Sequence, residues 1–233
     1  MSAGGLVRRG GGEEGDRLPV VLIHGALRSR AGLWPTAWYL RRFGLDARPF
    51  GYDTRGATLA EHGASLERFV EAWQAERPFR RIGILTHSMG GLVARAYLAR
   101  PSAVAQCDEQ RLVMLAPPNQ GAWLAAKMRG FRPFHWLYGA AAEELQPERA
   151  SRLPPPPPSA RVLILAGGAL RGDVGLLSRI PGNNDGLVRL AETALPGIEP
   201  VLVGGSHSVL QWRREVLKRA IDFLAQVGEA AAG

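Results

Sequence analysis

Cysteine is nearly missing from this 233-residue sequence, which contains only Cys107. A single thiol forms no intrachain disulfide and supplies no cysteine-rich metal site. We interpret Cys107, which the polar stretch DEQR follows, as a bystander. Long hydrophobic runs are missing as well: no 18 consecutive residues are apolar, so the sequence predicts no membrane-spanning helix.

The signatures of two common cofactor classes are also missing. The sequence has no HExxH motif and its five histidines are dispersed, so zinc-dependent hydrolysis is not predicted. The stretch GGALRG, after the apolar run at 161–166, lacks the GxGxxG spacing of a dinucleotide site, and no P-loop occurs. The sequence therefore predicts neither a zinc-dependent hydrolase nor a nucleotide-binding protein.

Positive charge is abundant, with a formal net charge of +8, but nearly all of it comes from arginine. The arginines are scattered along the chain and form only short pairs, such as Arg41-Arg42 and Arg213-Arg214. Binding along a phosphate backbone favours clustered basic residues that are interleaved with aromatic ones. The charge pattern therefore indicates a solvated basic surface and no nucleic-acid partner.

Length and composition are those of one globular domain. Apolar residues make up 46% and charged residues 21%, and 233 residues suffice for an α/β domain with a full core. Residues 1–18 contain an arginine pair with no apolar stretch after it, which argues against a signal peptide. We expect a disordered leader at 1–18, a single domain at 19–233 and a cytoplasmic protein.

Several short apolar runs, each bounded by turn residues, are typical of buried strands. The intervals between several of them carry helical spacing; from Leu66 onward, apolar residues recur at i, i+3, i+4 and i+7. Alternating strands and helices predict the α/β class, with a mostly parallel central sheet covered by helices on both faces. The predicted strands are 19–25, 47–53, 81–88, 111–118, 161–168 and 199–207, and the predicted helices are 58–77, 90–100 and 208–227.

One interval, at 120–160, departs from this alternation. It is too long for a simple crossover and too apolar for a disordered linker, and it closes with five prolines that we expect to return to the sheet as a stiff extended segment. We predict that it forms a small cap or lid insertion over the site. Its aromatic side chains must pack on the domain, on substrate or on both. They are Trp123, Phe131, Phe134, His135, Trp136 and Tyr138.

The stretch THSMGG places Ser88 between an apolar strand and a predicted helix. A nucleophile elbow requires this context, because the tight turn lifts the serine hydroxyl clear of the sheet. The usual pattern is GxSxG, whose small residues let strand and helix approach closely. Thr86 replaces the first glycine, but threonine is small and suits a strand end. We predict that Ser88 is a nucleophile; the alternative is a serine that only caps the following helix.

A serine hydroxyl needs a base, and the base needs an orienting acid. His207 is the predicted base, because it lies between small residues just before the C-terminal helix, whereas the other histidines belong to other motifs, a helix or the insertion. Asp173 and Asp185 are both candidates for the acid. We favour Asp185, because the apolar Leu187-Val188 behind it can anchor its loop, whereas flexible glycines flank Asp173. The resulting chain order is Ser, Asp, His.

An acyl-transfer site also needs backbone N–H groups that stabilise the oxyanion. One comes from the residue after the nucleophile, which is Met89. The other comes from the loop after the first core strand, in the stretch VVLIHGALRS, where Ala26 is the predicted donor and Leu27 lies behind it. Because the donor is the backbone, an apolar alanine can serve at this position.

The stretches VVLIHGA, THSMGGLVAR, LAPPNQGA, NNDGLV and GSHSVL resemble the α/β-hydrolase superfamily, specifically its bacterial lipase and esterase branch. The resemblance extends from about Pro19 to the C-terminal helix. It implies the α/β-hydrolase fold and a cofactor-independent carboxylic-ester hydrolase that acts on a small-molecule or lipid ester. On this interpretation, the residues expected to contact substrate are Leu27, Trp123, Phe134 and Trp136.

Two further classes of function are compatible with the same residues. Thioester or amide hydrolysis and acyl transfer use the same triad, and a non-catalytic protein of this fold would bind lipids or a partner instead. An intact triad argues against the non-catalytic alternative. Peripheral contact with a membrane is compatible with the sequence, and the sequence specifies no oligomeric state.

Overall fold

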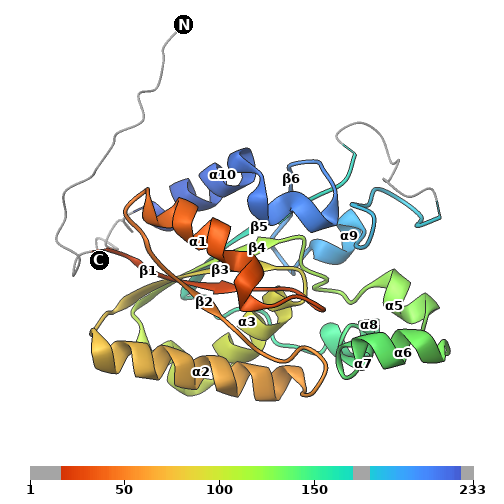
Figure 1. Cartoon of the computed structure of the whole chain (residues 1–233), viewed down its shortest axis with the longest axis horizontal. Coiled ribbons are helices and arrows are strands. Elements are labelled where there is room, and N and C mark those ends of the chain that lie inside the picture. Colours follow the sequence, from red (N-terminus) through yellow and green to blue (C-terminus); the bar gives the residue numbers. More distant parts are fainter. Residues whose placement is uncertain (1–16, 170–178, 227–233) are drawn as a thin grey trace, which may run out of the picture.

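The computed structural model describes residues 17–169 and 179–226. Strands and helices alternate along this chain, and all six predicted strands are present (Figure 1). The strands are β1 (Pro19–Ile23), β2 (Asp46–Phe50), β3 (Arg81–His87), β4 (Glu109–Leu115), β5 (Ala160–Ala166) and β6 (Val201–Leu202). The main helices are α1 (Trp34–Arg41), α2 (Leu59–Glu76), α3 (Gly90–Leu98), α4 (Pro101–Gln106), α9 (Leu190–Thr193) and α10 (Arg214–Ala225), with 3-10 helices η2 (Arg30–Leu33) and η3 (His207–Trp212).

The strands form one parallel sheet in the order β2-β1-β3-β4-β5-β6. The chain moves from β1 outward to β2 and then crosses back to place β3 on the other side of β1. Connections that leave neighbouring strands in opposite directions open a crevice at the carboxyl ends of the strands. The loop after β1 and the turn after β3 lie at this switch point, where the predicted site residues Ala26 and Ser88 fall.

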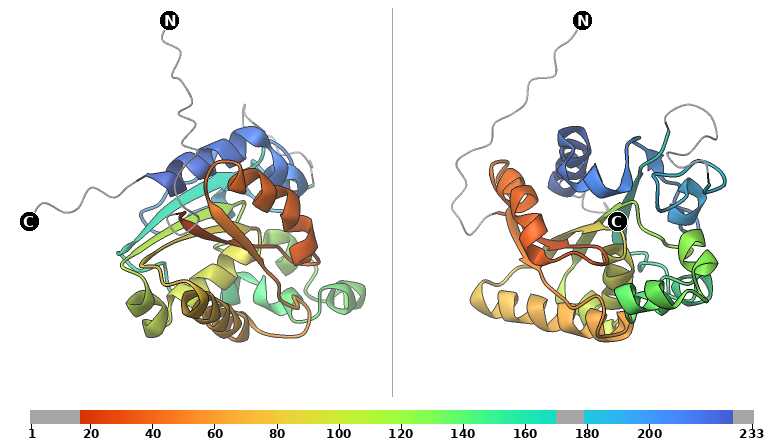
Figure 2. Two further views of the ribbon diagram at one scale, coloured as in Figure 1. Left: turned by 60° about the vertical axis from the view of Figure 1, so that its left-hand side comes forward. Right: turned by 45° about the vertical axis from the view of Figure 1, so that its right-hand side comes forward.

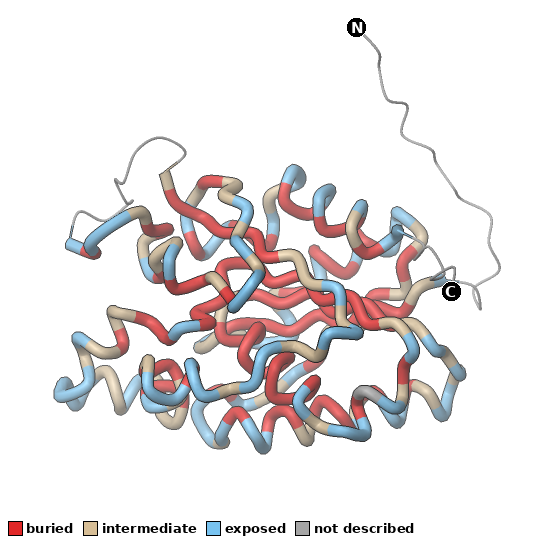
Figure 3. The backbone as a smooth tube through the Cα atoms, turned by 180° about the vertical axis from the view of Figure 1, so that it is seen from behind, coloured by how far each residue is buried: buried red, intermediate tan, exposed pale blue. Residues whose placement is uncertain are grey.

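Two apolar cores lie on the two faces of the sheet. The helices α1 and α10 cover one face, and α2 and α3 cover the other (Figure 1). All five residues of β1 are buried, and Figure 3 shows buried strands between helices whose outer surfaces are exposed. The helix α2 begins at a capping box, in which the Thr58 side chain accepts from the Glu61 backbone and Glu61 from that of Thr58. The prediction of a sheet covered on both faces is confirmed.

The C-terminal region differs from the prediction in two ways. The strand predicted at 199–207 is only two residues long; beyond it Gly204 and Gly205 adopt positive φ values of 68° and 97°, and Gly205 forms an isolated antiparallel bridge with Gly168. The helix predicted at 208–227 is divided into η3 and α10. The break lies at Arg213, whose guanidinium donates to the Val203 carbonyl at 3.0 Å and also to the Gly204 carbonyl.

The segment at 120–160 contains four short helices, α5 (Trp123–Lys127), α6 (Arg132–Tyr138), α7 (Ala141–Glu144) and α8 (Pro147–Ala150). They lie at the carboxyl end of the strands, beside the α2 and α3 layer (Figure 1). The five prolines at 154–158 form neither helix nor strand and lead to the start of β5. A buried arginine of α3, Arg95, donates to the carbonyls of Asn119, Leu153 and Pro154 and so ties both ends of the segment to the domain.

Two sequence predictions fall outside the described part of the chain: Asp173, the alternative acid, and nearly all of the leader at 1–18. Among the described residues, no helix is both long and apolar enough to cross a membrane.

Candidate active site

Ser88 lies on the turn between β3 and α3 with a φ of 54°, a left-handed conformation that a serine adopts only where its surroundings enforce it. The turn is closely packed. A Cβ atom on Gly90 would lie 2.7 Å from the Ile23 carbonyl oxygen, and one on Gly25 would lie 2.9 Å from the Ser88 Cβ atom. Only glycine fits at either position. Thr86 is accommodated because its hydroxyl donates to the Val113 carbonyl, on β4, at 3.3 Å.

His207 and Asp185 form a buried pair. Nδ1 of His207 lies 2.7 Å from Oδ2 of Asp185, and the backbone N–H of His207 donates to the Asp185 carbonyl at 2.9 Å. The other carboxylate oxygen, Oδ1, accepts from the backbone N–H groups of Leu187 at 3.0 Å and Val188 at 2.8 Å. With Nδ1 donating to the carboxylate, Nε2 of His207 carries the lone pair that can accept a proton.

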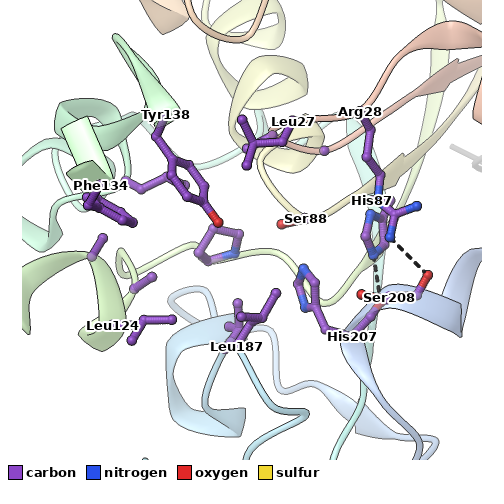
Figure 4. A pocket seen from close by; sticks show the side chains of 17 residues that line it. Leu27, Arg28, His87, Ser88, Leu124, Phe134, Tyr138, Leu187, His207 and Ser208 are labelled. Carbon is purple, nitrogen blue, oxygen red and sulfur yellow. Dashed lines mark hydrogen bonds between the residues drawn. The ribbon is translucent and has the colours of Figure 1, made fainter. Parts of the chain in front are cut away.

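Ser88 and His207 line the same pocket (Figure 4). Within the described part of the chain, the Ser88 hydroxyl forms no hydrogen bond, so its contact with Nε2 of His207 is not made in this conformation. Hydrogen bonds between a nucleophile and its base are commonly long in the absence of substrate and tighten when it binds. The structure thus brings together Ser88, His207 and Asp185 from three loops that are distant in the sequence.

The backbone N–H groups of Ala26 and Met89 have no acceptor among the described residues. Their neighbour Leu27 differs, because its N–H donates to the Thr54 hydroxyl at 3.2 Å. Met89 precedes the first residue of α3, where the helix dipole favours negative charge. Ala26 lines the pocket beside Ser88. Both N–H groups therefore lack a protein acceptor in the part of the chain that the structure describes, although Met89 itself is not among the residues that line the pocket.

His87 is a contributor that the sequence did not single out. Its Nε2 lies 2.8 Å from the His207 carbonyl oxygen, and the two rings are 4.8 Å apart. Burial, together with the nearby His207, lowers the pKa of His87 to about 3. A neutral His87 that donates from Nε2 holds the backbone of His207 in place (Figure 4). Its position directly before Ser88, inside the motif THSMGG, was the sequence signal that could have identified it as a site residue.

The pocket has a cavity volume of about 350 Å³ and two chemically different halves. The strand-end half carries Ser88, His207, His87 and the side chain of Arg28, which donates to the Ser208 carbonyl at 3.3 Å. No acidic side chain is among the lining residues. The other half, which we call the cap half, is apolar and is formed mainly by the segment at 120–160. It is lined by Ala122, Leu124, Ala125, Phe134, Tyr138 and Leu145, and Leu27, Leu187 and Val188 complete the wall.

Of the four residues expected to contact substrate, Leu27 and Phe134 line the pocket, whereas Trp123 and Trp136 do not. The helix α6 turns Phe134 and Tyr138, four residues apart, toward the pocket, so Trp136 between them points outward and is 76% exposed. Trp123 begins α5, where its backbone N–H donates to the Glu192 carboxylate at 2.6 Å. The helical spacing from Phe134 was the signal that would have identified Tyr138.

No group of three or more His, Cys, Asp or Glu side chains in the described ranges is arranged to hold a metal ion. The Cys107 thiol is buried, and burial raises its pKa to about 11, which disfavours the reactive thiolate.

The chain belongs to the α/β-hydrolase-fold family, whose sequence profile matches residues 19–154. The propeptide form of the Bacillus licheniformis lipase BlEst2 superposes with a TM-score of 0.74 at 19% identity, over 93% of this chain and 52% of that one. Its mature form superposes with a TM-score of 0.68 at 18% identity, over 89% of this chain and 86% of that one. The metagenomic carboxyl esterase MGS0156 superposes with a TM-score of 0.66 at 18% identity, over 95% of this chain and 77% of that one. A comparison with curated proteins finds no significant match. The fold is therefore esterase- and lipase-like, as the sequence resemblance implied.

Proposed function

We propose that this protein is a serine hydrolase that cleaves carboxylic esters, with Ser88 as nucleophile, His207 as general base and Asp185 as the acid that orients the base. The observation that carries the proposal is the buried 2.7 Å contact between Asp185 and His207, in one pocket with a serine on a left-handed turn. Aligned structures from lipases and esterases support the same class of chemistry.

The mechanism follows from these positions. Nε2 of His207 takes the proton of Ser88 as the serine oxygen attacks the ester carbonyl, and Asp185 stabilises the imidazolium that forms. The N–H groups of Ala26 and Met89 bind the oxyanion of the tetrahedral intermediate. His207 then gives its proton to the leaving alcohol, which produces an acyl-enzyme. Water, activated by His207, releases the acid and restores Ser88.

The segment at 120–160 is proposed to act as a cap that forms the acyl pocket. Its side chains supply the apolar half of a cavity whose other half contains Ser88. A volume of about 350 Å³ lies at the lower end of the range of small-molecule sites. An acyl chain in the apolar half would place its carbonyl carbon at Ser88, with the alcohol portion directed toward Arg28 and the solvent.

The decisive test is Ser88→Ala assayed with p-nitrophenyl esters of increasing acyl length. We expect kcat/KM to fall by roughly 10³-fold or more, because the nucleophile is lost, while the melting temperature changes little. Ser29→Ala is the matched control, since Ser29 is an exposed serine near the site whose side chain caps no helix.

A fluorophosphonate probe provides a second, independent measurement. Peptide mapping of the wild-type protein should locate the label on Ser88 and on no other serine. Ester turnover without Ser88 labelling would assign the nucleophile elsewhere. No turnover of any ester and no labelling would favour a non-catalytic member of the fold.

A further inference from the structure

Four of the six tryptophans lie on the surface. Their side chains are 50% exposed at Trp34, 60% at Trp38, 76% at Trp136 and 44% at Trp212. Indole rings carry large apolar areas and are normally well buried in a protein without a binding partner at that surface. The hydrolase mechanism uses none of these four rings, so their exposure needs a separate explanation.

Each exposed tryptophan has an arginine guanidinium over its ring. The distances from the guanidinium carbon to the ring centroid are 5.4 Å for Arg41 over Trp34, 4.9 Å for Arg42 over Trp38, 5.9 Å for Arg55 over Trp136 and 5.4 Å for Arg28 over Trp212. We call these four contacts the Trp–Arg pairs. Each pair combines an apolar indole ring with a planar guanidinium, which can bind two phosphate oxygens at once.

Three of the four Trp–Arg pairs are linked to the pocket or to the cap beside it, and the fourth, Arg42 over Trp38, lies one helical turn beyond Trp34 on α1. Arg28 lines the pocket itself. The indole N–H of Trp212 donates to the Gly32 carbonyl at 3.3 Å, which joins η3 to the segment that leads into Trp34. On the cap, Trp136 lies on the outer side of the helix that directs Phe134 inward, and Arg55 donates to its carbonyl at 2.8 Å. The right-hand view of Figure 2 turns the carboxyl end of the strands forward and shows α1 in orange, the C-terminal segment in blue and the cap in green.

Exposed aliphatic residues complete this surface. Leu27 and Leu187 line the mouth of the pocket, and Val209 lies on η3 next to Ser208, another lining residue. Tryptophan prefers the level of the lipid headgroups, and arginine beside it pairs with phosphate. A nucleic acid would match the arginines but would leave the aliphatic mouth without a counterpart. The chain as a whole is cationic, with a net charge of +8.

We propose that the Trp–Arg pairs bind the surface of a bilayer that contains anionic phospholipids, so that the pocket opens toward the membrane. The tryptophan rings lie among the headgroups, the arginines contact lipid phosphates and the aliphatic mouth faces the acyl chains. Membrane binding by this surface does not depend on the proposed hydrolase activity. The consequence that the ester substrate comes from the membrane rests on that proposed function.

Vesicle binding of the Ser88→Ala protein tests the surface without turnover of lipid. We expect co-sedimentation with phosphatidylcholine vesicles that contain phosphatidylglycerol, weak binding to pure phosphatidylcholine and a loss of binding as salt is added. Arg42→Gln and Arg55→Gln should each weaken the partition coefficient about fivefold. Arg161→Gln is the charge-matched control and should have little effect, because Arg161 is exposed at the start of β5, at the amino end of the strands and away from the pocket.

Tryptophan substitutions test the other half of each pair. Trp38→Gln and Trp136→Gln should reduce binding while the melting temperature is retained, and lipids brominated near the headgroup should quench the wild-type fluorescence more strongly than that of either variant.

Two outcomes would overturn the proposal, and a further one would separate it from the proposed function. If Arg161→Gln weakened vesicle binding as much as Arg42→Gln and Arg55→Gln do, binding would depend on net charge alone and not on the Trp–Arg pairs. Absence of binding to phosphatidylglycerol vesicles would exclude the membrane, and binding of a single-stranded oligonucleotide in its place would assign the surface to nucleic acid. A protein that binds vesicles but hydrolyses no ester would retain this proposal and refute the proposed function.

Discussion

The two halves of the pocket are held in different ways. In the strand-end half, His207 and Asp185 are buried, and backbone hydrogen bonds fix both the Asp185 carboxylate and the His207 main chain. The cap half consists of four helices of at most seven residues each, and α6 buries none of its residues fully. The difference indicates that the residues of the proposed chemistry lie on rigid loops of the sheet, whereas the shape of the proposed acyl pocket depends on a weakly supported segment.

A few buried polar side chains attach the cap to the domain. Arg95, buried on α3, donates to three carbonyls at the two ends of the cap, and its burial lowers its pKa to about 10, which leaves it charged at neutral pH. Within the cap, the amide of Gln146 donates to the Ala125 and Ala142 carbonyls at 3.1 and 3.0 Å. The cap is therefore expected to loosen before the strand-end half does.

The largest effect is expected in the strand-end half, from Asp185→Asn. The imidazole of His207 would lose its orienting anion and take the wrong tautomer, so kcat for p-nitrophenyl butyrate should fall by about 10⁴-fold. Asp173→Asn should be nearly silent in the same assay. The opposite result for the two variants would identify Asp173 as the acid.

The next largest effect, a loss of stability that begins in the attachment of the cap, is expected from Arg95→Met. The carbonyls that Arg95 contacts would lose a donor, and we expect the free energy of unfolding in urea to fall by about 3 kcal/mol. Limited proteolysis should then cleave preferentially within 120–153. Arg68→Met, at an exposed position on α2, is the control and should change stability by less than about 0.5 kcal/mol. Unchanged protease resistance of the cap would show that other contacts hold it.

Acid should weaken the strand-end half through His87. Burial lowers its pKa from 6.5 to about 3. The unfolded chain binds a proton near pH 6.5, so between these values unfolding takes up a proton and the free energy of unfolding falls as the pH falls. His87→Gln keeps an N–H donor for the His207 carbonyl but does not titrate. From pH 7 to pH 5 the wild type should lose about 2 kcal/mol more than this variant in urea titrations. Equal losses would mean that His87 is accessible to protons in the folded state.

The smallest effect is expected from the cap half on substrate choice. Phe134→Ala removes a ring from the apolar wall, so the ratio of kcat/KM for decanoate over butyrate esters should change roughly tenfold. Phe131→Ala is the matched control, because Phe131 is exposed and does not line the pocket. An unchanged ratio together with a large drop in melting temperature would leave Phe134 a structural role only.

The sequence by itself determined the sheet and the position of the turn that carries Ser88. Short apolar runs bounded by turn residues favour buried strands, and a serine between such a run and a predicted helix defines a strand–turn–helix connection whose glycines permit close packing. These signals are local, since the residues that create them are neighbours in the chain. Local signals do not specify the direction in which a side chain points. The sequence therefore predicted four substrate contacts, of which Leu27 and Phe134 line the pocket and Trp123 and Trp136 do not.

Only the tertiary structure decided which distant residues meet. Three contacts each join segments that are distant in the sequence. They are the contact between His207 and Asp185, the hydrogen bond from His87 to the His207 backbone, and the hydrogen bonds of Arg95 to the two ends of the cap. Scattered arginines gave no sign of a basic aromatic surface, yet folding places Arg28 over Trp212 and Arg55 over Trp136. Such contacts depend on the path of the whole chain around the sheet, which no local pattern encodes.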